Sequence, residues 1–368
     1  MPDRTDTSIA SPRGTIMRSQ RTASRAAALL AAGYALLALP AAAQEKTLNI
    51  VDYGGAFEAA ADKAWFKPFA EAQGVKIATE QYDGGVAKLR AMVEARNTIW
   101  DLIDLETNDA ITACDEGLLQ KLDPALLGDR SDFIKGAILP CAVSSMIWST
   151  VFAYDTSKMQ TQPTTVADFF DIQKFPGKRG LRKSPKVSME WALMADGVPA
   201  GEVYKVLATD DGVKRALNKL STIKDRIVWW EAGSQPPQLL ADGAVAMTMA
   251  YNGRIYDAKK KENKPFAIVW DGQVYDYEWW GIPTGAKDKD LAEKFIKYAS
   301  AKDNIWKLSN FISYASPRKS SVEAMNKAVL PDMPTAPDNF KNALQIDAEF
   351  WADKYDSINS RFMTWLGQ

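Results

Sequence analysis

The chain has 368 residues, and its 45 basic and 46 acidic side chains give a formal net charge of −1. This balance offers no electrostatic reason to bind nucleic acid or an anionic membrane. The sequence contains no histidine and only two cysteines, which excludes a histidine-based catalytic triad, a histidine metal ligand and a zinc site built from four cysteines.

The first 43 residues have the pattern of a secretory signal peptide. Three arginines within 18–25 precede an apolar run over 26–39, and the small residues of Pro40-Ala41-Ala42-Ala43-Gln44 follow. A basic segment, about 14 apolar residues and a small-residue site are typical of export signals, and such a run is too short for an ordinary transmembrane helix. We therefore expect cleavage near Gln44 and export to the periplasm, with an over-long polar start at 1–15. An uncleaved, membrane-tethered helix is the alternative.

The roughly 324 residues that follow exceed what one hydrophobic core usually holds, so two domains are expected. Short apolar runs bounded by turn residues predict strands over 47–53, 75–81, 100–105, 144–154, 227–230, 244–251, 266–270 and 278–283. Helical periodicity and turn residues predict helices over 57–73, from 86, over 108–116, from 188, over 212–220, 236–242 and 291–301, and two helices within 339–366. This alternation indicates an α/β fold with mostly parallel sheets.

The two cysteines, Cys114 and Cys141, are predicted to form one disulfide, since that is the simplest state of two cysteines in an exported protein. Closing this loop would stabilise the fold by about 3–4 kcal/mol in the loop-entropy model. A reactive thiol pair is the less favoured alternative because the spacing is not that of a CxxC motif.

Catalytic and phosphate-binding motifs are weak in this sequence. Gly54-Gly55 follows a predicted strand but belongs to neither a GxGxxG nor a GxxxxGK[ST] motif, so a tight turn is the better interpretation. Several carboxylates stand at strand ends or helix starts, namely Asp83, Glu106, Asp109, Glu190, Glu231 and Glu278. Paired acids could hydrolyse glycosides, but most such acids cap helices or face solvent. An exported carboxylate-dependent hydrolase remains the alternative function.

Aromatic and charged residues cluster at three predicted strand ends, in Trp229-Trp230-Glu231, Tyr251-Asn252-Gly253-Arg254 and the segment 275–280. Neighbouring side chains of a strand face opposite ways, so at least one ring of each Trp-Trp pair is expected to leave the core. Rings beside carboxylates suit an amine ligand, through cation–π contact and a charged acceptor.

The order of several segments resembles the periplasmic solute-binding proteins of ABC importers, in particular the spermidine/putrescine-binding branch. The segments are NIVDYGG, WDLIDLETNDA, DEGLLQKLD, FPGKRGL, LLADGAVAMTMAYNGR, EWWGIPTGAKDKDLAEKFIKYAS and YASPRKS. The resemblance implies a type II periplasmic binding protein that is not an enzyme. Two α/β lobes, each with a mostly parallel sheet, would close on the ligand about a crossing-strand hinge. It also implies a monomer with no cofactor and no metal that delivers a small amine to membrane permease subunits.

The resemblance places the crossings between lobes near 148–154, 251–255 and 311–317. One lobe would comprise 44–147 and 255–312, and the other 148–254 and 313–368.

Ligand-binding positions match this branch only in part. The first turn, Tyr53–Ala56, lacks the expected tryptophan and acid, and Glu106–Asp109 stand where serine or threonine and tyrosine are expected. The family's Trp-x-Gly-Asp aligns with Tyr251–Arg254. Glu278 stands where the family also has an acid, and Tyr314 matches a tyrosine of the family. The expected ligand-binding set is Tyr53, Asp83, Glu106, Asn108, Glu190, Trp230, Glu231, Tyr251, Arg254, Glu278, Trp280 and Tyr314.

Arg254 replaces an acid that grips an amine in the family, which reverses the local charge. An arginine would repel a polyamine but could hold a carboxylate through two parallel hydrogen bonds. With Glu278 kept for an ammonium group, the sequence suggests a zwitterion such as γ-aminobutyrate (GABA), with polyamines as the other candidates. A surface or inter-lobe salt bridge is the alternative role for Arg254.

Overall fold

The computed structural model describes residues 46–368, so the signal peptide predicted over 1–43 lies outside the described residues. None of the helices in the described part is both long enough and apolar enough to cross a membrane.

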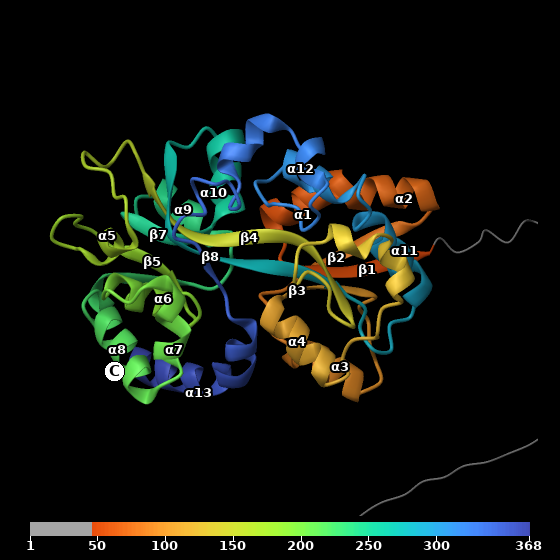
Figure 1. Ribbon diagram of the computed structural model, residues 1–368, viewed down its shortest axis with the longest axis horizontal. Helices are drawn as coiled ribbons and strands as arrows, with labels where there is room; N and C mark the ends of the chain where they lie inside the picture. Colours follow the sequence, from red (N-terminus) through yellow and green to blue (C-terminus); the bar gives the residue numbers. More distant parts are fainter. Residues whose placement is uncertain (1–45) are drawn as a thin grey trace, which may run out of the picture. The chain divides into compact units, whose positions relative to one another are not determined.

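A nine-stranded sheet runs through residues 46–368 (Figure 1). Its order is β2-β1-β3-β8-β4-β7-β5-β6, and β9 pairs with β8. The strands are β1 Thr47–Asp52, β2 Lys76–Gln81, β3 Leu102–Glu106, β4 Ala142–Asp155, β5 Arg179–Arg182, β6 Ile227–Trp230, β7 Met247–Tyr251, β8 Phe266–Gly281 and β9 Leu344–Gln345.

Both ends of the sheet are parallel, whereas its centre is antiparallel. At one end β1 is parallel to β2 and β3, and at the other β5 is parallel to β6 and β7. The long strands β4 and β8 pair antiparallel along most of their length and connect the two ends (Figure 1). The predicted α/β class is therefore confirmed.

Helices flank the sheet. They are α1 Gly55–Ala61, α2 Lys67–Gln73, α3 Ala87–Glu94, α4 Thr107–Asp115, α5 Val166–Phe170, α6 Ser188–Ala195, α7 Val203–Leu207, α8 Asp210–Ser221, α9 Gln235–Ala241, α10 Asn252–Lys261, α11 Lys289–Ala299, α12 Ser321–Ala324 and α13 Ala348–Gly367. A π-helical turn, Asp62–Phe66, joins α1 to α2, and 3₁₀ turns cover Pro124–Leu127, Arg130–Asp132, Ala200–Glu202, Lys224–Arg226, Ile305–Asn310 and Lys327–Asp332.

Local sequence explains many of these boundaries. The α2 helix ends at Gly74, which adopts the left-handed conformation that favours glycine at a helix C-terminus. At the start of α8, the Thr209 side chain accepts a hydrogen bond from the backbone N–H of Gly212, as an N-cap does.

The structure departs from the predicted elements in three places. The strands predicted over 266–270 and 278–283 belong to one 16-residue strand, β8, because 274–277 also pair with β4, and only 270–273 lie at a register shift without a β4 partner. Residues 339–366 contain one helix, α13, rather than two. Helix α10 begins directly after β7, where an extended crossing was expected.

Buried apolar side chains form separate cores at the two ends of the sheet. One core packs β5–β7 against α6, α8 and α13, with Trp191, Leu220 and Trp351 at its centre. Two adjoining cores cover the β1–β3 end, one around Trp65 and the other around Trp279. A further core packs α9 and α10 against β4, β7 and β8.

The disulfide is present as predicted. Cys114, in α4, bonds to Cys141, the residue before β4, with their Cα atoms 5.9 Å apart.

Candidate ligand-binding site

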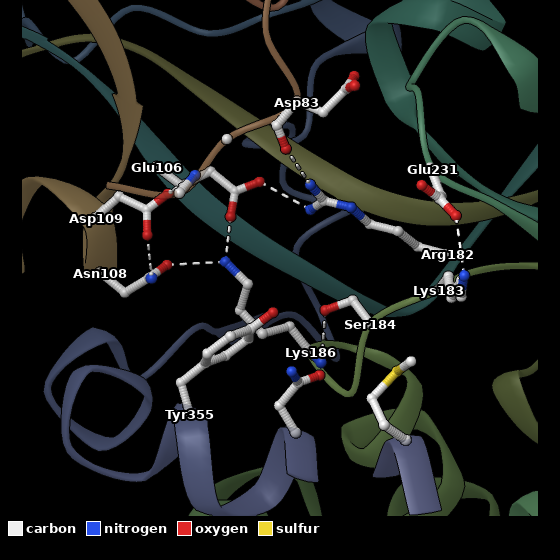
Figure 2. A pocket seen from close by; sticks show the side chains of 14 residues that line it. Asp83, Glu106, Asn108, Asp109, Arg182, Lys183, Ser184, Lys186, Glu231 and Tyr355 are labelled. Carbon is white, nitrogen blue, oxygen red and sulfur yellow. Dashed lines mark hydrogen bonds and ion pairs between the residues drawn. The ribbon is translucent and has the colours of Figure 1, made fainter. Parts of the chain in front are cut away.

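Two neighbouring cavities lie between the cores, and Glu106 lines both of them. The first, which we call the aromatic cavity, is lined by Tyr53, Phe57, Glu106, Met146, Trp148, Tyr251, Arg254, Glu278 and Tyr314. The second, the charged cavity, is lined by Asp83, Gly84, Gly85, Glu106, Asn108, Asp109, Arg182, Lys183, Ser184, Lys186, Glu231, Tyr355, Asn359 and Met363 (Figure 2). The aromatic cavity measures only about 30 Å³ against about 400 Å³ for the charged one, so a solute that enters it must be short and must move the lining rings.

Tyr251 and Trp148 form part of one wall of the aromatic cavity, and Trp230 packs behind Tyr251. The Tyr251 ring lies 5.1 Å from the Trp148 ring and 5.9 Å from the Trp230 ring, with interplanar angles of 82° in both pairs. Tyr251 closes β7, whereas Trp148 lies in the middle of β4. Aromatic faces held this way can contact an ammonium group.

Three polar atoms of the aromatic cavity have no hydrogen-bond partner among the described residues. They are Nε of Arg254, Oε1 of Glu278 and Nε1 of Trp148. Arg254 and Glu278 are only 5% and 3% exposed. Buried polar groups normally have partners, so a cationic donor, a carboxylate acceptor and an indole donor are available there to a bound solute.

Gly55 permits the position of Arg254, and Gly253 permits that of the neighbouring Tyr314. A Cβ atom on Gly55 would lie 2.3 Å from Nη1 of Arg254, and one on Gly253 would lie 2.5 Å from the Tyr314 ring. The guanidinium therefore reaches the first turn of the chain, where its Nη2 donates a hydrogen bond to the carbonyl oxygen of Tyr53 at 3.1 Å.

Glu278 and Glu106 stand directly opposite each other on β8 and β3, but their electrostatic surroundings differ. Burial raises the pKa of Glu278 well above its ordinary value, and the nearby Asp104 and Glu106 raise it further. Burial acts in the same direction on Glu106, but Lys186 and Arg182 outweigh it and lower its pKa to about 2. Glu106 is thus ionised at neutral pH, whereas Glu278 holds its proton more tightly than an ordinary glutamate does.

Both oxygens of Glu106 are bonded to cations. Its Oε1 accepts a hydrogen bond from Nη1 of Arg182 at 2.9 Å, and its Oε2 pairs with Nζ of Lys186. Figure 2 shows the carboxylate held between these two side chains, which come from β5 and from the turn before α6. The three side chains are 5%, 18% and 9% exposed, so the group is well shielded from water.

Further polar contacts order the charged cavity. Asn108 accepts from Nζ of Lys186 at 2.8 Å and donates to Asp109 at 2.7 Å, while Lys183 pairs with Glu231 at 3.1 Å (Figure 2). Val187, directly after Lys186, has φ of 66°, a strained value for a β-branched residue. Backbone strain of this kind often occurs where a functional side chain must be aimed.

The structure separates the sequence-derived ligand residues into three groups. Those that line the aromatic cavity are Tyr53, Glu106, Tyr251, Arg254, Glu278 and Tyr314. Asp83, Asn108 and Glu231 line the charged cavity together with Glu106. Glu190, Trp230 and Trp280 line neither.

These last three side chains have packing roles. Trp280 lies in the core among Phe57, Trp65 and Phe295. Trp230 is 2% exposed and supports Tyr251 from behind.

Glu190 is fully buried and accepts hydrogen bonds from the Trp351 indole and the Tyr204 hydroxyl. It lies in α6, and through these bonds it holds α13.

Sequence reasoning did not name Arg182, Lys186 or Trp148 as site residues. Arg182 ends β5, and the carboxyl ends of parallel strands are where α/β proteins bind ligands. The position of Arg182 at a strand end could therefore have indicated a ligand-binding role. Nothing local distinguishes Lys186 from the many surface lysines, because its burial depends on Glu106, 80 residues earlier in the chain.

The aspartates and glutamates of the site do not form a metal centre: within residues 46–368 no cluster of three or more acidic, histidine or cysteine side chains could hold a metal ion.

Comparison with known proteins identifies the family. A model of the bacterial extracellular solute-binding proteins matches residues 64–338. The chain belongs to this family. Since its members bind solutes for transport, the protein is a solute-binding protein and not an enzyme, and the hydrolase alternative is wrong.

Relatives and solved structures agree with this assignment. The γ-aminobutyric acid-binding protein of Pseudomonas aeruginosa is 45% identical over 331 residues, which cover 90% of this chain and 94% of that protein. The structure of the Atu4243 GABA receptor is 30% identical with a TM-score of 0.77, covering 87% of this chain and 98% of that one.

The AgtB binding protein of A. tumefaciens R10 in complex with agropinic acid is 31% identical with a TM-score of 0.80, covering 88% of this chain and 99% of that one. Spermidine/putrescine-binding periplasmic proteins, such as that of Escherichia coli, are similar at 22% identity, which confirms the resemblance to this branch.

Proposed function

We propose that this protein is the periplasmic binding component of an ABC importer for a short zwitterion with an ammonium and a carboxylate group, of which GABA is the simplest example. The observation that carries the proposal is the aromatic cavity itself. It contains one cationic side chain, Arg254, and one carboxylate with an unpartnered oxygen, Glu278.

Each end of such a solute would have a defined partner. Arg254 would bind the carboxylate, since a guanidinium fits a carboxylate with charge-assisted hydrogen bonds. Glu278 would accept from the ammonium group, and the rings of Trp148 and Tyr251 would contact its charge. The 45% identity to a GABA-binding protein supports this ligand class, whereas a polyamine would meet Arg254 as a like charge.

Separate cores at the two ends of the sheet support a two-lobed molecule that closes on its ligand. In this proposal β4 is the first crossing, as expected for 148–154. The second crossing lies within β8 rather than at 251–255, since Val274 packs in one core and Trp279 in the other. The third lies after Met333, which packs with the β1–β3 end, and before Leu344, which packs with the β5–β7 end. This proposal differs from the boundaries expected at 255 and 313, which stay a prediction.

Export and partners follow from the same function. The amino-terminal pattern of 1–43 would direct the chain to the periplasm. There the protein would act as a monomer and present its solute to the permease subunits of an importer.

Calorimetric titration of the purified mature protein with GABA and putrescine tests the proposal. We expect saturable GABA binding without turnover, and a loss of at least tenfold in GABA affinity in Arg254→Ala, since the carboxylate loses its charged partner. Arg215→Ala is the matched control, because Arg215 forms an exposed ion pair with Asp196. If Arg254→Ala leaves both affinities unchanged, or if the parent protein prefers putrescine, the zwitterion proposal is wrong.

A further inference from the structure

The aromatic cavity contains two opposed carboxylates, yet only one of them is free to accept. Glu106 and Glu278 are register partners on neighbouring strands and both line the cavity. Two free acids in one cavity could accept hydrogen bonds from two ammonium groups. However, Oε1 of Glu278 has no partner among the described residues, whereas both oxygens of Glu106 are bonded to Arg182 and Lys186.

Glu106, Arg182 and Lys186 together form a group in which the two positive charges outweigh the negative charge of the carboxylate. The formal charges of Glu106, Arg182 and Lys186 sum to +1, and the neighbouring Asp109 offsets part of this charge. None of the three side chains is more than 18% exposed, so their charges are less screened than those of exposed side chains. Burial lowers the pKa of Lys186, but Glu106 and Asp109 outweigh it, so the lysine stays charged. A second ammonium group beside Glu106 would therefore find a like charge and no free acceptor oxygen.

We propose that Arg182 and Lys186 are specificity determinants that exclude diamines. They occupy both carboxylate oxygens of Glu106 from the opposite side of the cleft, by which we mean the space between the two proposed lobes. The inference deepens the proposed function and rests on it, since Glu106 lines the aromatic cavity in which the solute is proposed to bind. Arg254 would select for a carboxylate at one end of the solute. Arg182 and Lys186 would act separately, by removing the second site at which an ammonium could bind.

Matched lysine substitutions test this role. In Lys186→Met one oxygen of Glu106 loses its partner and the group loses its net positive charge, so putrescine affinity should rise at least tenfold over the parent protein. Lys205→Met is the control, since Lys205 forms an exposed ion pair with Glu202 and lines neither cavity. It should change putrescine affinity by less than twofold. Lys186→Arg keeps the charge and should retain the exclusion of putrescine.

A purely mechanical role gives a different result. If the ion pairs only hold the two sides of the cleft together, Lys186→Met weakens GABA and putrescine by the same factor, and the inference is overturned. Arg182→Met provides an independent second variant should Lys186→Met fail to fold, as judged by circular dichroism. Unchanged or weaker putrescine binding in every folded variant also overturns the inference.

The two proposals fail separately. Absence of GABA binding by the parent protein contradicts the proposed function. The inference is tested by the putrescine affinity of the variants relative to the parent protein. This comparison can be made even if the parent protein does not bind GABA.

Discussion

Glu278 is the residue whose protonation should couple to ligand binding. Burial and the surrounding acids Asp104, Glu106, Asp276 and Asp109 raise its pKa. An adjacent ammonium group would lower that pKa again, because an opposite charge favours the ionised carboxylate. Binding of GABA should therefore release up to one proton.

The sign of the pH effect follows from this release. GABA affinity should rise with pH, by at most about tenfold per pH unit, until Glu278 is ionised in the free protein. Titrations in two buffers of different ionisation enthalpy measure the protons released. Glu278→Gln should abolish the release, while Glu106, with a pKa of about 2, stays ionised throughout. No proton release by the parent protein would contradict this role of Glu278.

Gly55 offers a test of how Arg254 is positioned. Gly55 and Gly74 have nearly the same φ, 61° and 63°, but only a Cβ on Gly55 would meet another residue, Nη1 of Arg254 at 2.3 Å. An alanine at either position should cost about 1–2 kcal/mol of folding free energy through backbone strain. Only Gly55→Ala should also weaken GABA binding. Denaturant unfolding and calorimetry separate the two effects, and equal GABA affinities of both variants would rule out the positioning role.

At the scale of elements, α13 is held to α6 by a buried acid. Glu190 accepts from the Trp351 indole at 2.8 Å and from the Tyr204 hydroxyl at 3.0 Å. Burial raises its pKa to about 7, although these hydrogen bonds oppose the shift. The folded state therefore binds a proton at Glu190 more tightly than the unfolded chain does.

This shift makes stability depend on pH. The contribution of Glu190 is complete below its ordinary pKa of 4.5 and is lost as pH rises through about 7. Glu190→Gln removes the titration, so the free energy of unfolding of the parent protein should fall relative to that of the variant between these pH values. Denaturant unfolding at several pH values measures the difference, with the exposed Glu71→Gln as control. A constant difference across the range would contradict the raised pKa.

At the scale of the whole molecule, the ligand should draw the two sides of the cleft together. Arg254 and Tyr251 follow or end β7, whereas Glu278 and Tyr314 pack with the β1–β3 end. A solute bound between them would link both sides, as in hinge closure. Small-angle scattering should show a smaller radius of gyration with saturating GABA. Arg254→Ala at the same GABA concentration should show less compaction, and equal curves with and without ligand for the parent protein would contradict closure.

The sequence by itself determined the features that depend on local pattern. Apolar periodicity and turn residues located most strands and helices, and Gly74 marked the end of α2. The order of segments placed the chain in its family, and the replacement of an acid by Arg254 predicts a different ligand charge. These features are local because periodicity and turn chemistry act within a few residues.

Only the tertiary structure decided which side chains share a cavity. Glu106 meets Arg182 and Lys186 across 76 and 80 residues of chain, and no local pattern encodes such contacts. The same holds for Glu190 and Trp280, which stand at strand ends or helix starts as ligand residues do but are buried against α13 and α1. Polar and aromatic residue types are suited both to binding and to packing, and the long-range arrangement of the chain determines which role each one has.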